Sequence, residues 1–245
     1  MKTKILIFIF CLLSSYLSFG QIREDEQKIL WDYPIKSGTE EWKQLESNKA
    51  KVDVCQIPDS ILQDISTNDL MTLCLQYPLL SDGFAFNNIN DGLKKLFSNF
   101  NGIRVLAKRQ NAINVFLERY ISEIRNIANV WHKYSDFDVW YSFECISLLE
   151  LIVSYSDFHN NTSKESQKKI LESLLLGYRE KIKYHECFQG HGFTSNLFAR
   201  AHTLIKIDSA LLENFEGMNK SVLFFGRADA DLINTIDSLS YNLIK

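Results

Sequence analysis

Residues 111–133 read NAINVFLERYISEIRNIANVWHK, and the pattern of this stretch decides the fold. Apolar side chains recur at steps of three and four, and charged side chains occupy positions between them. This period is typical of an amphipathic α-helix that buries one face in a protein core. The stretch therefore predicts a helix of about six turns. Its expected buried stripe is Ile113, Phe116, Leu117, Tyr120, Ile121, Ile124, Ile127, Ala128 and Trp131.

The next segment, residues 136–156, is apolar on nearly every side of a helix. A helix of this kind is covered all round, so we expect it at the centre of the molecule. Two glutamates inside it, Glu144 and Glu150, argue against a membrane-spanning helix.

Three more amphipathic helices are predicted after the central one, over residues 163–184, 194–214 and 228–244. Residues 160–163 supply the turn and the cap of the first of these, and its expected buried stripe ends at Ile182. The helix starts follow one another at irregular intervals, which argues against a strict repeat family. We therefore expect antiparallel helix hairpins that pack in sequence order.

The part of the chain before residue 111 predicts short helices instead. All three prolines lie before residue 79, and a proline inside a helix costs about 3 kcal/mol. Thr39 is placed to cap a helix that begins at Glu40. Ser66, with Asp69 three residues later, matches a capping box.

Together these patterns predict an all-α protein. Short helices over residues 31–110 are followed by five long antiparallel helices over residues 111–245, stacked as irregular hairpins in an α-α superhelix or bundle. Residues 21–245 are expected to form a single domain that contains these two subregions. A strand-like run at 221–225 is too short to indicate a sheet.

The first twenty residues have the three parts of a secretory signal peptide. Lys2 and Lys4 give a positive start, the apolar run Ile5–Leu13 follows, and small residues lead to Gly20. The run is shorter than the roughly 20 residues that a membrane-spanning helix needs. We expect cleavage after Gly20 and export to the periplasm, the cell surface or the medium. Cys11 lies inside the apolar run, so lipid attachment is not expected.

Composition argues against several classes of protein. The formal net charge is −3 and no run of five basic residues occurs, whereas nucleic-acid binding depends on neutralising phosphates. No second long apolar stretch follows the first, so we expect no nucleic-acid partner and no transmembrane segment in the mature chain. The sequence contains no G-x-S-x-G motif, no phosphate loop and no complete dinucleotide motif, and no cofactor is expected.

The mature chain keeps four cysteines, Cys55, Cys74, Cys145 and Cys187. In an oxidising compartment four cysteines allow three pairings, among which the sequence does not choose. A Cys55–Cys74 disulfide is the preferred pairing because the two residues belong to neighbouring short helices. Buried free thiols are the alternative.

Several short motifs resemble a family of exported bacterial proteins that has no assigned activity. In chain order they are Tyr33-Pro34, GTEEW at 38–42, CQIP at 55–58, CLQYP at 74–78 and FAFNN at 84–88. The likeness is densest over residues 31–110 and fades through the long helices. The resemblance implies export and a bacterial source, and it carries over no catalytic or binding residue.

The strongest local group of reactive side chains is His185, Cys187, His191 and His202. Imidazole and thiolate are preferred zinc ligands, and the glycine-containing turn after Cys187 would fold His191 back toward His185. The spacing matches no established zinc motif. The alternative is a helix end, where histidines interact favourably with the helix dipole and glycines stop the helix.

Aromatic side chains gather around the turn after the first long helix. If exposed, Trp131, Trp140 and Tyr141 would form a binding platform, because ring faces supply large rigid contact areas. At helical spacing, such residues are alternatively part of the core.

Glu144 and Glu150 are candidates for acids of raised pKa. Their six-residue spacing places them on different faces of one helix, so they do not converge by themselves. The alternative is a buried glutamate satisfied by a neighbouring Arg or a helix end.

No group in the sequence combines a nucleophile, a base and an anion site. We therefore predict an exported helical interaction module that binds a peptide, a protein or a glycan. The rival hypothesis is a hydrolase or metal-binding protein with its site around His185, Cys187, His191 and His202. Convergence of these donors within about 4 Å would favour the rival.

The signal peptide generates a first prediction. In a bacterium with intact export, the protein should be recovered outside the cytoplasm with Gln21 as its first residue. Mass spectrometry of the intact protein checks this, allowing for cyclisation of the new N-terminal glutamine. Recovery of a cytoplasmic chain that still begins at Met1 would contradict the expectation.

Overall fold

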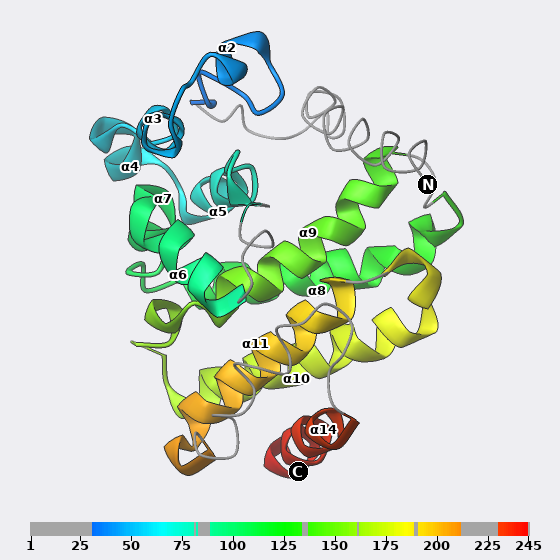
Figure 1. The fold of residues 1–245 in the computed structure, drawn as a ribbon. Coiled ribbons are helices and arrows are strands. Elements are labelled where there is room, and N and C mark those ends of the chain that lie inside the picture. Colours follow the sequence, from blue (N-terminus) through cyan, green and yellow to red (C-terminus); the bar gives the residue numbers. More distant parts are fainter. Residues whose placement is uncertain are drawn as a thin grey trace.

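The computed structural model describes an all-helical arrangement, shown in Figure 1. The described residues contain helices and no strand, so the predicted all-α class is confirmed. The predicted signal peptide and the strand-like run at 221–225 lie outside the described residues. Those residues are 31–80, 82, 89–133, 137–160, 162–188, 191–211 and 230–244.

Short helices occupy the described part of the chain before residue 111, as expected. Thr39 accepts a hydrogen bond from the Trp42 amide at 3.2 Å and so caps the first of them. Ser66 accepts from the Asp69 amide at 3.1 Å and donates to its carboxylate at 2.7 Å. The helices are α2 (Glu40–Lys43), α3 (Asn48–Val54), α4 (Asp59–Asp64), α5 (Thr67–Leu75), α6 (Ile89–Asn99) and α7 (Asn101–Leu106).

An aromatic cluster ties the segment before α2 to these short helices. The buried Tyr33 hydroxyl donates to the Leu73 carbonyl at 2.8 Å. Tyr77 stacks on Phe100 with ring centroids 4.0 Å apart and planes 6° from parallel. Several residues of the motifs that resemble the exported family are therefore core residues here; Tyr33, Trp42, Cys55, Ile57, Cys74 and Tyr77 are all buried.

The long helices form the other side of the molecule (Figure 1). Helix α9 packs against α8 and α11, while α10 packs against the same two helices, and α14 lies on α10 and α11. The apolar helix α9 thus lies among other helices, as its composition predicts. The bounds are α8 (Ala112–Val130), α9 (Phe137–Ser154), α10 (Lys164–Lys183), α11 (His191–Ile207) and α14 (Ala230–Ile244).

Both predicted boundaries of one helix are wrong. Helix α11 begins at His191 rather than at 194 and ends at Ile207 rather than at 214. Gly192 is helical, and a Cβ there would lie 3.0 Å from the Phe188 Cβ. The glycine therefore serves close packing at the helix start instead of stopping the chain.

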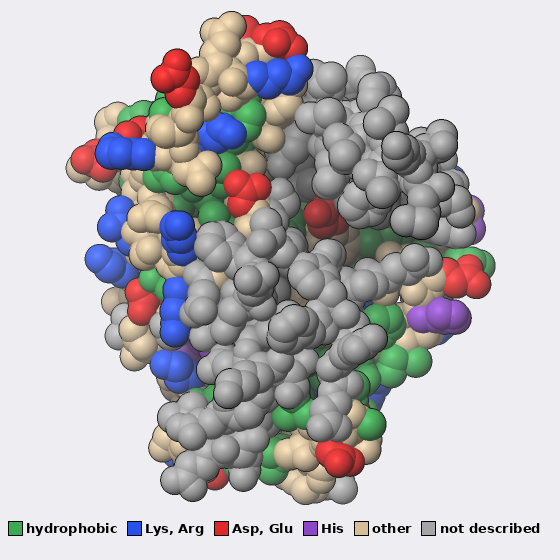
Figure 2. Space-filling model, in the orientation of Figure 1, with side chains coloured by type: hydrophobic (Ala, Val, Ile, Leu, Met, Phe, Trp, Pro, Cys, Tyr) green, Lys and Arg blue, Asp and Glu red, His purple; other side chains and the backbone are tan. Residues whose placement is uncertain are grey.

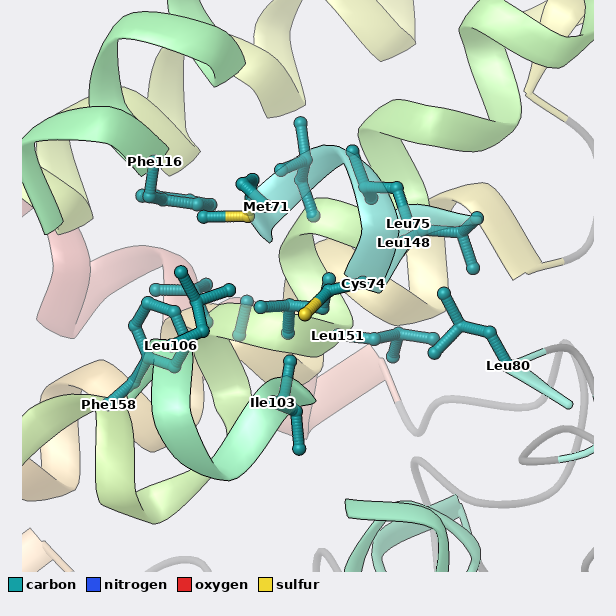
Figure 3. Close-up of a cluster of buried hydrophobic side chains, with 14 of the residues drawn as sticks. Met71, Cys74, Leu75, Leu80, Ile103, Leu106, Phe116, Leu148, Leu151 and Phe158 are labelled. Atoms are coloured by element: carbon teal, nitrogen blue, oxygen red, sulfur yellow. The ribbon is translucent and has the colours of Figure 1, made fainter. Parts of the chain in front are cut away.

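A shared apolar core joins the short helices to the long ones (Figure 3). Leu75 of α5 and Ile103 of α7 meet Leu148 and Leu151 of α9, with Phe116 of α8 at the edge of the group. None of the described helices is both long enough and apolar enough to cross a membrane.

The Cys55–Cys74 disulfide is not formed in the structure. None of the four described cysteines, Cys55, Cys74, Cys145 and Cys187, is in a disulfide, and the first three are buried. Burial raises the pKa of the Cys55 thiol to about 12 and also raises that of Cys74. These thiols fill core positions (Cys74 in Figure 3), the alternative that the sequence left open.

Thiol burial generates a second prediction. In the native protein, iodoacetamide should label the half-buried Cys187 and spare Cys55 and Cys74, because the thiolate is the reactive form and burial suppresses it. Mass spectrometry after labelling checks this. Denaturation without a reductant should then expose every cysteine, whereas two unreactive cysteines would show that the protein carries a disulfide.

Candidate functional site

A buried ion pair lies at the centre of the long helices. The Lys181 Nζ of α10 lies 2.5 Å from Oε2 of Glu150 of α9, and both side chains have no exposed surface. Burying two charges costs several kcal/mol for each ion unless further hydrogen bonds satisfy them. The surroundings of both groups therefore decide whether the pair is tolerated.

The carboxylate of Glu150 is fully satisfied. Tyr120 of α8 donates to Oε1 at 2.6 Å, and Asn196 of α11 donates to the same oxygen at 2.8 Å. Ser195 donates to Oε2 at 2.6 Å beside the Lys181 ammonium. Each carboxylate oxygen thus accepts two hydrogen bonds. The four donors belong to three helices, α8, α10 and α11.

The ammonium group of Lys181 is satisfied as well. Besides Glu150, its Nζ donates to the Gly192 carbonyl at 2.6 Å and to the Ser147 hydroxyl at 3.3 Å. Its three hydrogens therefore have three acceptors. We call Tyr120, Ser147, Glu150, Lys181, Ser195 and Asn196 the Glu150 cluster.

A glycine makes room for the Glu150 cluster. A Cβ at Gly177 of α10 would overlap with the Tyr120 hydroxyl. Glycine inside a helix costs about 1 kcal/mol relative to alanine, and here that cost permits the close approach of α8 and α10. The approach places the Tyr120 hydroxyl within reach of Glu150.

The pKa shifts agree with a closed, dry cluster. Burial raises the pKa of Tyr120, and the Glu150 charge adds to that shift, so the phenol stays protonated and donates. Burial lowers the pKa of Lys181, while Glu150 opposes the shift. The carboxylate is the partner that keeps the ammonium form inside the core.

The Glu150 cluster contains the groups that acyl-transfer chemistry uses. Ser195 lies beside a carboxylate and a lysine, as a nucleophile lies beside its base in many enzymes. In this structure, however, all three side chains are fully buried, and their donors and acceptors are engaged with one another. The arrangement acts as a structural clamp between α8, α9, α10 and α11.

Sequence reasoning identified Glu150 as a candidate buried carboxylate but missed Lys181 as its partner. A buried Glu150 satisfied by a neighbour was one expectation, but the partner is Lys181 rather than an Arg or a helix end. The predicted stripe of α10 ended at Ile182, which is 52% exposed, while Lys181 is buried. The available signal was spacing, since Lys181 follows Leu174 by seven residues and Tyr178 by three.

Glu144 is separate from the Glu150 cluster, as its helical spacing predicts. Its carboxyl is partly buried, and burial raises its pKa to about 7. This shift agrees with the expectation of an acid with a raised pKa at Glu144.

The structure does not assemble the metal site predicted from the sequence. His202 lies eleven residues after His191 on one helix, a separation of roughly 16 Å along the axis. Its ring contacts Phe198 instead, with centroids 4.4 Å apart. Cys187 faces the Trp131 carbonyl at 3.9 Å. Among the described side chains, which leave out that of His191 but include that of His185, no group of three or more possible ligands could hold a metal ion.

One member of the predicted aromatic platform is exposed. The Trp131 side chain, just after α8, is 42% exposed, and its ring lies 5.8 Å from that of Tyr184 at the end of α10. The side chains of Trp140 and Tyr141 lie outside the described residues. A surface around Trp131 is therefore available, with Tyr184 as a neighbour that sequence reasoning missed.

A second ion pair holds α14 on the long helices. Arg200 of α11, fully buried, bonds Asp237 of α14 at 2.6 Å. Its guanidinium also lies 4.3 Å from the ring centroid of Tyr178.

In comparisons with protein-family models, curated proteins and solved structures, nothing matches this chain. Its function is therefore inferred from its own residues and their geometry.

The clamp generates a third prediction. Lys181→Met leaves the buried Glu150 charge without its partner and should lower the free energy of unfolding by about 3–5 kcal/mol. Urea unfolding followed by circular dichroism measures the change. Lys49→Met removes an exposed lysine that pairs with Asp53, and as the matched control it should cost less than about 1 kcal/mol.

A double-mutant cycle with Glu150→Leu separates the pair from its surroundings. The two substitutions together should cost less than the sum of the single ones by about 1–3 kcal/mol, because each single variant strands one charge. Simple additivity would contradict the account of a coupled buried pair.

Proposed function

We propose that the chain is an exported helical module that binds a peptide, a protein or a glycan through an exposed aromatic surface. We call this surface the aromatic end; it comprises Trp131 and His132 after α8, with Lys183 and Tyr184 at the end of α10. The exposure of Trp131 is the observation that carries the proposal.

Exposed large apolar side chains that cluster on a protein surface commonly mark a binding site. Among the described residues, the large exposed hydrophobic side chains are Trp131, Leu176 and Ile182. Trp131 differs from the other two because two aromatic rings lie near it. The ring centroid of Tyr184 lies 5.8 Å from that of Trp131, and the ring centroid of His132 lies 6.4 Å from it. Tryptophan and tyrosine are enriched among the residues that dominate binding energy at interfaces.

The aromatic end also has a polar rim. His132, Lys133, His185 and Glu186 are exposed around it, and the Lys183 ammonium lies 4.7 Å from the Tyr184 ring centroid. Figure 2 shows histidine, acidic and hydrophobic side chains together at the right edge of the molecule. An apolar centre within a polar rim is the usual composition of a recognition surface.

The supporting helices fix the aromatic end. Tyr120 of α8 and Lys181 of α10 both belong to the Glu150 cluster, and Lys181 precedes Tyr184 by three residues. Tyr184 therefore lies one turn from a clamped residue, whereas Trp131 follows the clamped Tyr120 by about three turns at the end of α8. A surface positioned in this way loses little conformational freedom on binding, which favours affinity.

The exported location rests on the signal peptide predicted from Met1 to Gly20. The alternative of a hydrolase or metal-binding protein around His185 has no converging donor set among the described residues to support it. Binding is thus the better supported function.

The aromatic end generates a fourth prediction. A phage-displayed peptide library and a glycan array, each probed with the protein, should yield ligands whose binding falls by at least about tenfold in Trp131→Ala, since an aromatic anchor contributes 2 kcal/mol or more. Surface plasmon resonance of each selected ligand gives the ratio.

Leu176→Ala is the matched control, because Leu176 of α10 is also a large exposed hydrophobic side chain but lies outside the aromatic end. It should bind each selected ligand as the unaltered protein does. Ligands that bind Trp131→Ala unchanged would overturn the assignment of the aromatic end, and the peptide or glycan identity of the selected ligands decides the class of partner.

A further inference from the structure

Basic side chains from three elements meet at the other end of α11. His202 and Lys206 lie one turn apart on α11, so they share a face. His159 lies on the 3-10 turn η3 (Ser156–His159), which packs against α11. We call His159, His202, Lys206 and Lys94 of α6 the basic cluster.

Helix α6 reaches the basic cluster through an aromatic contact. Phe97 of α6 meets the ring of Tyr155, the residue before η3, with centroids 5.1 Å apart. Lys94 precedes Phe97 by one turn and is exposed. The charges of His159, Lys206 and Lys94 all act on His202, which agrees with this placement.

The imidazole of His159 has one nitrogen free. The side chain is 3% exposed, and its Nε2 lies 2.7 Å from the Val153 carbonyl oxygen. A carbonyl only accepts, so Nε2 carries the hydrogen and Nδ1 of the neutral ring is a bare acceptor. Nδ1 is buried and has no partner among the described residues.

The carboxylates of the described side chains nearby, which leave out that of Asp91 on α6, do not supply the basic cluster with a counter-charge. Asp157 on η3 bonds Tyr155 and the Asn160 amide, and Asp208 after α11 accepts from the Ala210 amide at 3.0 Å. Arg104 of α7 adds a further positive charge near Tyr155. Neither Lys94 nor Lys206 forms an ion pair with a described residue.

The setting is locally positive on a protein of net negative charge. Lys and Arg side chains gather along the left edge of the molecule in Figure 2, the side on which Figure 1 places α6 and α7. Burial, reinforced by the nearby cations, lowers the pKa of both His159 and His202 to about 4. Both rings are therefore neutral at neutral pH, and an added anion would favour their charged forms.

We propose that the basic cluster is a binding site for an oxyanion, the phosphate, sulfate or carboxylate group of a ligand. The anion gives Lys94 and Lys206 their counter-charge. As it binds, the two imidazoles each take one proton from solvent, and Nδ1 of His159 changes from a bare acceptor to a hydrogen-bond donor. This site is distinct from the aromatic end, because it lies at the opposite end of α11.

Proton uptake fixes the sign of the pH dependence. A group that is neutral in the free protein and charged in the complex makes binding tighter as pH falls. Sulfate is the suitable probe because it keeps its double charge between about pH 5 and 7.5. This range lies above the pKa of about 4 of both free rings, so a proton taken up there is taken up together with the anion. We expect isothermal titration of the protein to give a sulfate affinity at least about tenfold tighter at the lower pH.

Variants locate the site. Lys206→Ala and Lys94→Ala should each weaken sulfate binding by about tenfold at the lower pH, since each removes one charge facing the anion. Arg125→Ala removes an exposed cation of α8 that belongs to neither surface, and it should leave the affinity unchanged. His202→Asn keeps the lysines but removes one titrating ring, so it should flatten the pH dependence.

The outcomes separate the site from general charge effects. Equal losses in Arg125→Ala and Lys206→Ala, an affinity that does not change with pH, or no sulfate binding at the lower pH would each overturn the proposal. Circular dichroism of every variant confirms that the compared proteins are folded. Loss of binding at the aromatic end would leave this result unaffected.

Discussion

The burial of one ion pair, Glu150 with Lys181, is the constraint on which the arrangement of the long helices depends. Two buried charges are tolerated only when hydrogen bonds satisfy the charged groups. Those partners come from α8, α9, α10 and α11, so the four helices must meet in one register. Gly177 is part of the same requirement, because a larger residue would keep Tyr120 away from the carboxylate.

Both proposed binding surfaces lie at the ends of the long helices, outside the clamp. The serine, the lysine and the carboxylate that resemble an acyl-transfer site are engaged with one another inside the core. Helix α11 runs from the neighbourhood of the aromatic end to the basic cluster, and it contributes Ser195 and Asn196 to the clamp between them. Two surfaces of different chemistry, one aromatic and one cationic, therefore extend from one rigid frame.

Local features of the sequence predicted most of the fold. The caps at Thr39 and Ser66 depend on nearby residues alone, and the structure confirms them. The predicted stripe of α8 is buried at Ile113, Phe116, Tyr120, Ile124 and Ile127. It is wrong at its end, because Ala128 and Trp131 are exposed. Lys181 and the start of α11 depend on partners distant in sequence, so periodicity favoured Ile182 and placed the helix start too late. For the candidate sites, Trp131 could be singled out from its residue type. The group of His185, Cys187, His191 and His202 looked local in sequence, but the length of α11 separates its last two members.

Amide hydrogen exchange tests the role of the Glu150 cluster most directly. If the cluster is a closed clamp, the amides around Glu150, Lys181 and Asn196 open only with global unfolding and should be the slowest to exchange, slower than those of α2 and α3. The contradictory result is fast exchange of these amides, at rates like those of the short N-terminal helices. That result would mean that the cluster opens readily to water, so that Ser195 and Glu150 would be accessible for chemistry rather than locked in the core.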